Sequence, residues 1–113
     1  MLTAADFLAP PVRRTQVVDL PVKGGQVAVR GLFAMESVRL SDALKEASGE
    51  SQRLLAVQLA AFVSDTEGRP LFTVEQAMNA LGNMEPADLK AIIEAGTKLN
   101  RLTDETIEEA GKN

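Results

Sequence analysis

The chain has 113 residues, which is enough for one compact domain with its own core and too short for two. It contains no Cys and no His, which excludes disulfides, thiolate catalysis and sulfur-ligated metals and removes the commonest general base, so we expect neither a cofactor nor an enzyme. The net charge of −4 argues against a nucleic-acid partner, because nucleic-acid binding requires a basic face.

Residues 1–14 are predicted to form an N-terminal arm that is free to move. Pro10 and Pro11 would end any helix that begins at Thr3. The arm lacks the basic region and long apolar core of a signal peptide, and the chain has no run of the roughly 18 apolar residues that a membrane span requires. We therefore expect a cytoplasmic protein with no membrane partner.

Residues 15–33 are predicted to form a β-hairpin at the start of a single domain that extends to residue 102. The two segments that flank Gly24 and Gly25 have the residue types of strands, and the glycines can take the positive φ of a tight turn. A lone hairpin is marginal in water, so it must pack against helices or against a strand of another chain. Its free edge is a candidate contact surface.

Most of the remaining chain has the periodicity of helices, so we predict a mainly α fold: a small domain of four to five helices with an N-terminal β-hairpin. The second helix is apolar over much of its circumference, which is typical of the central helix of a domain. The predicted helices run from an N-cap at Ser37 to about residue 47, from about Glu50 to Val63, from Thr73 to Leu81, from Pro86 to about residue 101, and marginally over residues 103–113.

Local signals refine this picture. The segment Thr73-Val-Glu-Gln76 matches a capping box, and Leu71 and Phe72 before it are expected to point toward the core. Gly96 lies inside a helix, where glycine costs about 1 kcal/mol relative to alanine, so it suggests a close helix crossing. Residues 103–113 are acidic with few apolar positions, which predicts a weak helix or a linker.

The loop at residues 63–72 holds two carboxylates but does not match a calcium site. With Gly68 at the invariant sixth position of a calcium loop, Val63 and Val74 would occupy two positions that require carboxylates. Asp65 and Gly68 instead predict a turn that leads into the next helix. We therefore expect no metal.

In their order along the chain, several segments resemble the small tail assembly chaperones of long-tailed (siphovirus-like) phages and prophages. The central loop resembles that family's "v-D-e-x-G-x-p-l-f" pattern. The resemblance covers nearly the whole chain, in short pieces whose order and spacing carry it. These pieces are the opening at 1–8, the strand at 25–32, the loop at 63–72, and the ending at 99–102 with 108–113.

The resemblance implies a non-catalytic role in the host cytoplasm, outside the mature virion. Members of the family bind the tape measure protein, a long and largely helical chain, and help tail-tube subunits to polymerise around it. Several families also make a longer product by a programmed ribosomal frameshift, and the extension contacts the tube protein. Here Gly111, Lys112 and Asn113 are the candidate frameshift junction, because Gly-Lys or Lys-Asn can be encoded by runs of G and A.

We expect the client to bind apolar surface on the helices at 50–63 and 86–101. A second copy of the chain, in a homo-oligomer, is a further candidate partner. The main alternative is a generic helical adaptor or regulatory protein that binds another host or phage protein. A third class, a small enzyme built from Asp, Glu and Lys, would need convergent carboxylates in a deep pocket. The candidate partner-binding residues are Leu55, Leu59, Phe62, Leu71, Phe72, Ile92, Ile93 and Leu99.

Overall fold

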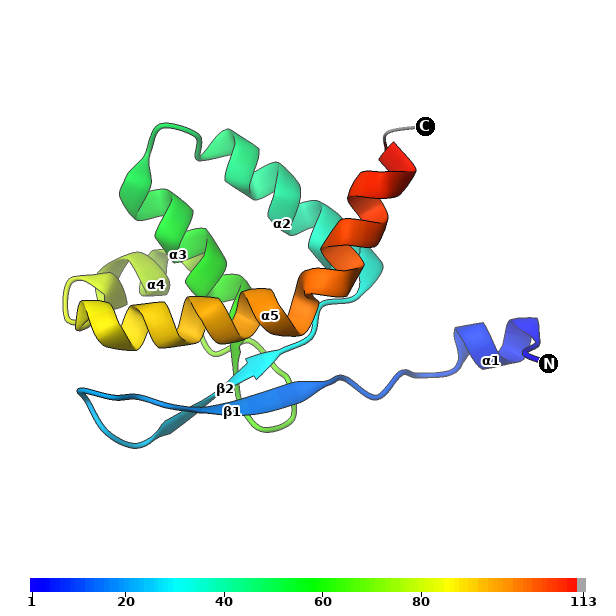
Figure 1. Ribbon diagram of the computed structural model, residues 1–113, viewed down its shortest axis with the longest axis horizontal. Coiled ribbons are helices and arrows are strands. Elements are labelled where there is room, and N and C mark those ends of the chain that lie inside the picture. Colours follow the sequence, from blue (N-terminus) through cyan, green and yellow to red (C-terminus); the bar gives the residue numbers. More distant parts are fainter. Residues whose placement is uncertain (112–113) are drawn as a thin grey trace.

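The structure is a computed structural model that describes residues 1–111, with side chains described up to Arg101. The described part of the chain is mainly helical with an N-terminal antiparallel hairpin, so the predicted fold class is confirmed. Its elements are α1 (Ala4–Leu8), β1 (Thr15–Asp19), β2 (Gln26–Arg30), α2 (Ala34–Glu46), α3 (Ser51–Phe62), β3 (Val63–Ser64), α4 (Val74–Leu81) and α5 (Pro86–Gly111). Figure 1 shows α2 to α5 gathered above the hairpin and α1 apart from them on a protruding arm.

A third strand that the sequence did not predict extends the hairpin to an antiparallel sheet with the order β1-β2-β3. The prediction that the second helix reaches Val63 was wrong, because α3 ends at Phe62 and Val63 is extended. Val63 is β-branched and fully buried beside Val29 of β2, so its place in the sheet outweighs one more residue of helix. The hairpin therefore gains a strand partner from within its own chain.

The core lies between the sheet and the helices, and α3 is its central element, as its broad apolar surface predicted. This helix packs against α2, α4 and α5. Its Leu59 is fully buried, as are Val29 and Val63 of the sheet. The buried cluster joins residues of both layers, namely Val18, Val29, Leu32, Ala56, Leu59, Phe62, Val63, Ala77 and Ile92.

Helices α3 and α5 approach closely at Gly96, as the presence of a glycine inside a helix suggested. A Cβ atom at this position would lie 2.9 Å from Phe62 Cβ and would also overlap Cγ of the same ring. Close-packed interiors do not accommodate such overlaps, so glycine is what allows α5 to pass over Phe62. The crossing thus brings together the two helices that carry most of the candidate partner-binding residues.

The predicted starts of α4 and α5 are confirmed. Thr73 caps α4: its Oγ1 accepts a hydrogen bond from Gln76 N at 3.2 Å, and Thr73 N donates to Gln76 Oε1 at 3.0 Å. Helix α5 begins at Pro86, where a missing N–H costs nothing. The capping box and the N-terminal proline are local signals, which is why the sequence alone located them.

Two other predicted helix starts differ from the structure. Ser37 does not cap α2, which begins at Ala34; the start is instead satisfied by Glu36, whose carboxylate accepts a hydrogen bond from Phe33 N at 2.9 Å. No separate helix begins at Thr103, because α5 continues to Gly111 through a stretch without Gly or Pro. The use of residues 103–113 as a linker stays a prediction, and the last two residues of the candidate frameshift junction lie outside the described residues.

Candidate functional site

The structure divides the eight candidate partner-binding residues between core and surface. Leu59, Phe62 and Ile92 are buried members of the core, so they shape the surface from beneath it. Leu55 lies at the surface, and Leu71 is 50% exposed, so the expectation that Leu71 points into the core was wrong. The others, Phe72, Ile93 and Leu99, are partly buried and pack against the core.

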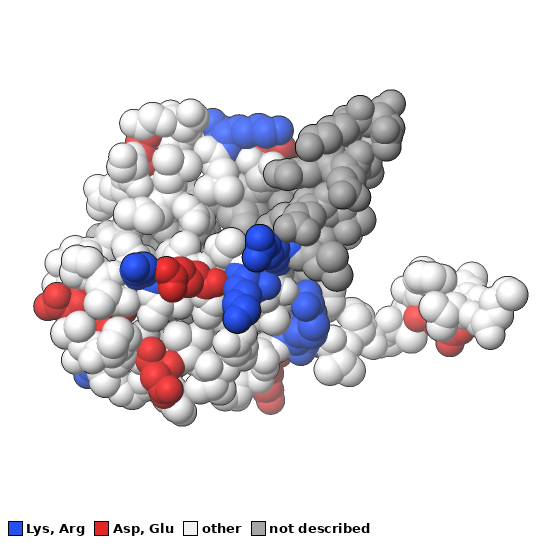
Figure 2. Space-filling view, in the orientation of Figure 1, with Lys and Arg blue, Asp and Glu red and all other residues white. Residues whose placement is uncertain are grey.

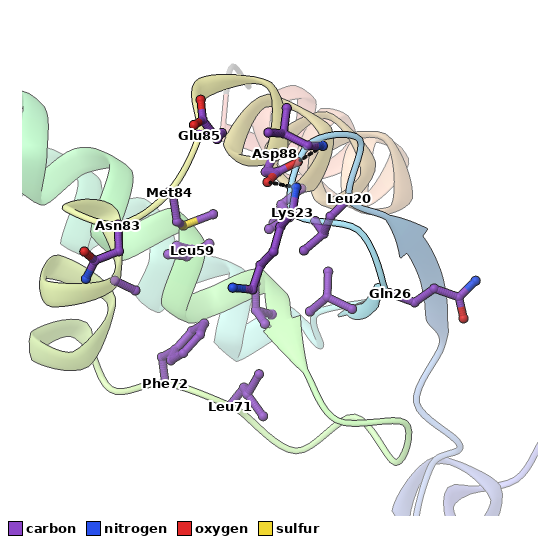
Figure 3. A pocket seen from close by; sticks show the side chains of 15 residues that line it. Leu20, Lys23, Gln26, Leu59, Leu71, Phe72, Asn83, Met84, Glu85 and Asp88 are labelled. Carbon is purple, nitrogen blue, oxygen red and sulfur yellow. Dashed lines mark hydrogen bonds between the residues drawn. The ribbon is translucent and has the colours of Figure 1, made fainter.

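An apolar cavity of about 580 Å³ brings four of these candidates together. It opens between the hairpin turn, α3, the segment before α4 and the connection from α4 to α5. Figure 3 shows apolar side chains around it, with Lys23 reaching over it from the turn and Met84 facing the α3 side. The candidates in its wall are Leu59, Leu71, Phe72 and Ile92. A cavity of this size and lining suits bulky apolar side chains rather than a charged substrate.

The hairpin turn that forms one wall of the cavity is held by Asp88 of α5. The buried carboxylate accepts hydrogen bonds from Val22 N at 2.8 Å and from Lys23 N at 2.9 Å, as the dashed lines in Figure 3 show. Gly24 and Gly25 close the turn with φ of 79° and 78°, as predicted. Asp88 thereby fixes the turn against the start of α5, and the shape of the cavity depends on it.

A separate, shallower groove of about 290 Å³ lies between α3 and α5. It brings together two more candidates, Leu55 and Ile93, beside Pro86 and Leu89. Lys90 and Glu94 also line it and form an exposed ion pair at 3.8 Å. The groove therefore has an apolar floor with a charged rim, which is the composition of a surface that binds an amphipathic helix.

The loop that enters the cavity wall is organised by Asp65, as its turn chemistry predicted. Its Oδ1 accepts hydrogen bonds from Glu67 N at 2.9 Å and Arg69 N at 3.0 Å, and its Oδ2 accepts one from Arg69 Nε at 2.8 Å. These hydrogen bonds lower the pKa of Asp65, and the one from the backbone N–H of Arg69 contributes most. Gly68 completes the turn at φ 84°. The carboxylate is thus engaged within its own loop.

Arg13, Arg30 and Glu36 form a half-buried ionic cluster that anchors the end of the N-terminal arm. Arg13 binds Glu36 through two hydrogen bonds of 2.6 and 3.1 Å, and Arg30 lies 3.6 Å from the same carboxylate. The hydrogen bond from Arg13 lowers the pKa of Glu36, and burial lowers the pKa of Arg30. Arg13 also stacks over the Phe33 ring at 4.2 Å. The two arginines share one carboxylate, and they also donate to the backbone oxygens Gly31 O and Ala61 O, so all three side chains are engaged within the fold.

Asn100 is a buried polar residue that the sequence analysis did not single out. Its Nδ2 donates to Arg30 O at 3.2 Å and to Gly96 O at 2.8 Å, while its Oδ1 accepts from Leu32 N at 2.7 Å. The side chain therefore ties the end of β2 to α5 behind the ionic cluster. Nothing in a single Asn on a helix distinguishes this role from an exposed position, so only the fold reveals it.

Comparisons with known proteins give a match in structure but not in sequence. No protein-family model matches the chain, and no curated protein matches it. The structure is similar to that of the bacteriophage HK97 tail assembly chaperone, with a TM-score of 0.56 and 16% identity over 84% of this chain and 90% of that chain. The two proteins therefore share a fold over nearly their whole lengths. In addition, no helix in the described part of the chain is long and apolar enough to cross a membrane.

Proposed function

We propose that this protein is a tail assembly chaperone of a long-tailed phage or prophage, which binds the tape measure protein and helps to recruit tail-tube subunits without catalysing a reaction. The observation that carries the proposal is the shared fold with the HK97 tail assembly chaperone, which spans most of both chains. The order of sequence motifs along the chain supports it independently, because motif order and backbone geometry are separate observations.

The two apolar surfaces give the proposal a physical basis. A long amphipathic helix presents large apolar side chains along one face, and such a face binds in hydrophobic grooves of a partner. The cavity beside Phe72 and the groove beside Ile93 offer apolar contacts of this kind on one small domain. Each contact is small, so affinity for a long client would come from many copies bound along it.

The proposal assigns client contact to exposed residues and a supporting role to the core. Leu71 at the cavity and Leu55 at the groove are open to a partner. Placing a carboxylate at either position would put a charge against apolar client side chains, which costs more than the lost contact alone. Core positions such as Leu59 are poor test sites, because truncating a buried leucine destabilises the whole domain by about 2–5 kcal/mol.

Co-purification with the neighbouring tape measure protein tests the proposal. We expect the two chains to co-purify after co-expression, and Leu71→Asp and Leu55→Asp each to weaken binding about 10- to 100-fold, the equivalent of one buried leucine. Met35→Asp is the matched control, since Met35 is exposed on α2 and lines neither surface. Clean separation of the wild-type chains would contradict the proposal and favour the generic adaptor.

The frameshifted product is the second part of the proposal. A longer chain that continues past Gly111 would keep the client-binding domain and add a segment for the tail-tube protein. The coding DNA tests this directly: a slippery run over codons 110–113 and an overlapping downstream frame are expected. Mass spectrometry of the expressed gene should then show a minor, longer product; a single product from a sequence without such a run would rule this part out.

A further inference from the structure

The outer edge of β1 carries unpaired backbone groups in the described part of the chain. The strand pairs with β2 on one side and is the end strand of the sheet. Arg14 O accepts a hydrogen bond from Gly31 N, and Leu20 N donates to Gly25 O, so the even-numbered residues face β2. By the alternation of antiparallel pairing, the N–H and C=O groups of Thr15, Val17 and Asp19 point outward.

This edge lacks most of the features that normally prevent a strand from pairing with another chain; its one charged residue is Asp19, at the end of the strand. Proteins protect free edges with proline, lysine, a β-bulge or a covering segment. The strand Thr15-Gln-Val-Val-Asp19 has neither proline nor lysine, and its pairing with β2 is continuous over all five residues. Val17 is 56% exposed and lines a groove with Leu71 on the sheet face opposite the core. An open edge beside a groove that mixes apolar and polar side chains is suited to receive a strand.

The edge is complementary to itself. If two β1 strands pair antiparallel around a two-fold axis at Val17, each Val17 faces its equivalent in the second copy. Thr15 then faces Asp19 of the second copy at both ends, so the two carboxylates stay apart. The residues that point outward are also the ones that meet in this register, so their N–H and C=O groups all find partners. Such reciprocal contacts are what a two-fold interface requires.

The N-terminal arm offers a second contact to the same partner. Residues 1–12 are exposed throughout, and Figure 2 shows the arm as an almost uncharged projection from the body. The molecular surface is 7820 Å², whereas a compact monomer of this mass exposes about 6000 Å². The arm contributes to this excess with five large apolar side chains, each at least 69% exposed: Met1, Leu2, Phe7, Leu8 and Val12.

Pairing of the β1 strands would carry each arm to the cavity of the other copy. In the register centred on Val17, Arg14 of one copy lies beside Leu20 of the other. Residues 21–23 form a turn, so the pairing ends there and the arm that precedes Arg14 leaves the strand next to this turn. Leu20 and Val22 line the 580 Å³ cavity. Phe7 lies in α1, seven residues before Arg14, and seven residues span at most about 23 Å, so its ring can enter that cavity.

We propose that two copies form a two-fold dimer by antiparallel pairing of β1 around Val17, with the arm of each copy packed on the apolar cavity of the other. Each arm buries five large apolar side chains at roughly 100 Å² each. With both arms and an equal area on the surfaces that they cover, the total is about 2000 Å², the size of a stable interface. The inference goes beyond the proposed function. Since the arm and a client would share the cavity, the dimer is tested without the client.

A single cysteine tests the strand register, since the natural chain has none. In Val17→Cys the paired Cα atoms would lie about 5.5 Å apart, within the range for a disulfide. We expect a covalent dimer under mild oxidation. In the control Thr15→Cys, the cysteines of the two copies would lie about 13 Å apart, so this variant should not crosslink. The double variant Thr15→Cys with Asp19→Cys should crosslink, because positions 15 and 19 face each other across the dimer. Equal crosslinking of Thr15→Cys and Val17→Cys, or none in Val17→Cys, would overturn the proposed register.

Sedimentation equilibrium of the full chain tests the dimer and the arm. Val17→Pro removes only an outward-facing N–H, so it should leave the helical circular dichroism intact and weaken the dimer at least 10-fold, while Val17→Thr should keep it. Phe7→Ser with Leu8→Ser should weaken the dimer by a similar factor with the crosslink at position 17 retained. Even a weak dimer is populated at about 100 μM protein. A wild-type chain that is still monomeric at that concentration would overturn the proposal.

Discussion

The close crossing at Gly96 yields a prediction in which two effects oppose each other. Inside an exposed helix, Gly→Ala should stabilise by about 1 kcal/mol, because alanine has the higher helix propensity. At Gly96 the new Cβ would sit 2.9 Å from Phe62 Cβ and overlap the ring. Ordinary carbon contacts are about 3.5 to 4.0 Å, so one of the helices must move.

Relief of this overlap is restricted on both sides. Phe62 is the last residue of α3 and leads directly into Val63, which is fully buried in the sheet, so it cannot shift without disturbing β3. Forcing an extra methyl group into a packed core costs about 1–3 kcal/mol, and more where the backbone is constrained. Because both sides of the crossing are constrained, the upper part of this range applies, about 2–3 kcal/mol; after the propensity gain of about 1 kcal/mol is subtracted, we expect Gly96→Ala to lower the free energy of unfolding by about 1–2 kcal/mol.

Urea denaturation followed by circular dichroism measures this change, since the chain has no Trp or Tyr for fluorescence. Gly82→Ala is the matched control: Gly82 is in the right-handed helical region, and a Cβ there would make an ordinary contact of 3.5 Å with Asn79 O. It should be neutral or stabilising by about 0.5 kcal/mol. A Gly96→Ala variant as stable as the wild type would refute the argument that the crossing requires glycine.

Three further predictions address the polar contacts. Asn100→Ala leaves buried backbone groups such as Leu32 N without partners and should destabilise by about 2–4 kcal/mol in the same urea titration. Asp88→Ala should accelerate hydrogen exchange at the two turn amides that it now binds, with protection in the core unchanged; equal exchange rates would argue against its role. Because Arg13 lowers the pKa of Glu36, the contribution of Glu36 to stability is present above the unfolded-state value of about 4.3 and is lost as pH falls through the lower folded-state pKa. Thermal unfolding should therefore show a smaller loss of stability below about pH 4.5 for Glu36→Gln than for the wild type.

The features that the sequence predicted depend on neighbouring residues. The cap at Thr73, the proline at the start of α5 and the glycines of the hairpin turn act within a few residues, so their patterns are visible in the chain itself. The crossing at Gly96 was also predicted, because an unfavourable residue inside a helix indicates a need for space.

The features that the sequence missed depend on residues far apart in the chain. Strand β3 exists because β2 offers Val63 an edge, and Asn100 is buried because the end of β2 lies against α5. Asp88 binds a turn more than sixty residues away. From the sequence alone, Val63 could equally be the last residue of a helix, Asn100 an exposed polar residue, and Asp88 an acidic residue in the first turn of a helix. The candidate site was predicted as a set of apolar positions, and only the fold separates exposed Leu71 from buried Leu59.

The proposed role of this small domain is that of a chaperone for a long helical client in tail assembly. Its most direct test is the soluble yield of the tape measure protein, expressed alone and together with this chain at matched levels. We expect the client to be largely insoluble alone, soluble in the presence of the wild-type chain, and again insoluble with a Leu71→Asp, Leu55→Asp double variant that remains folded. Unchanged solubility of the client in the presence of the wild-type chain would contradict this role.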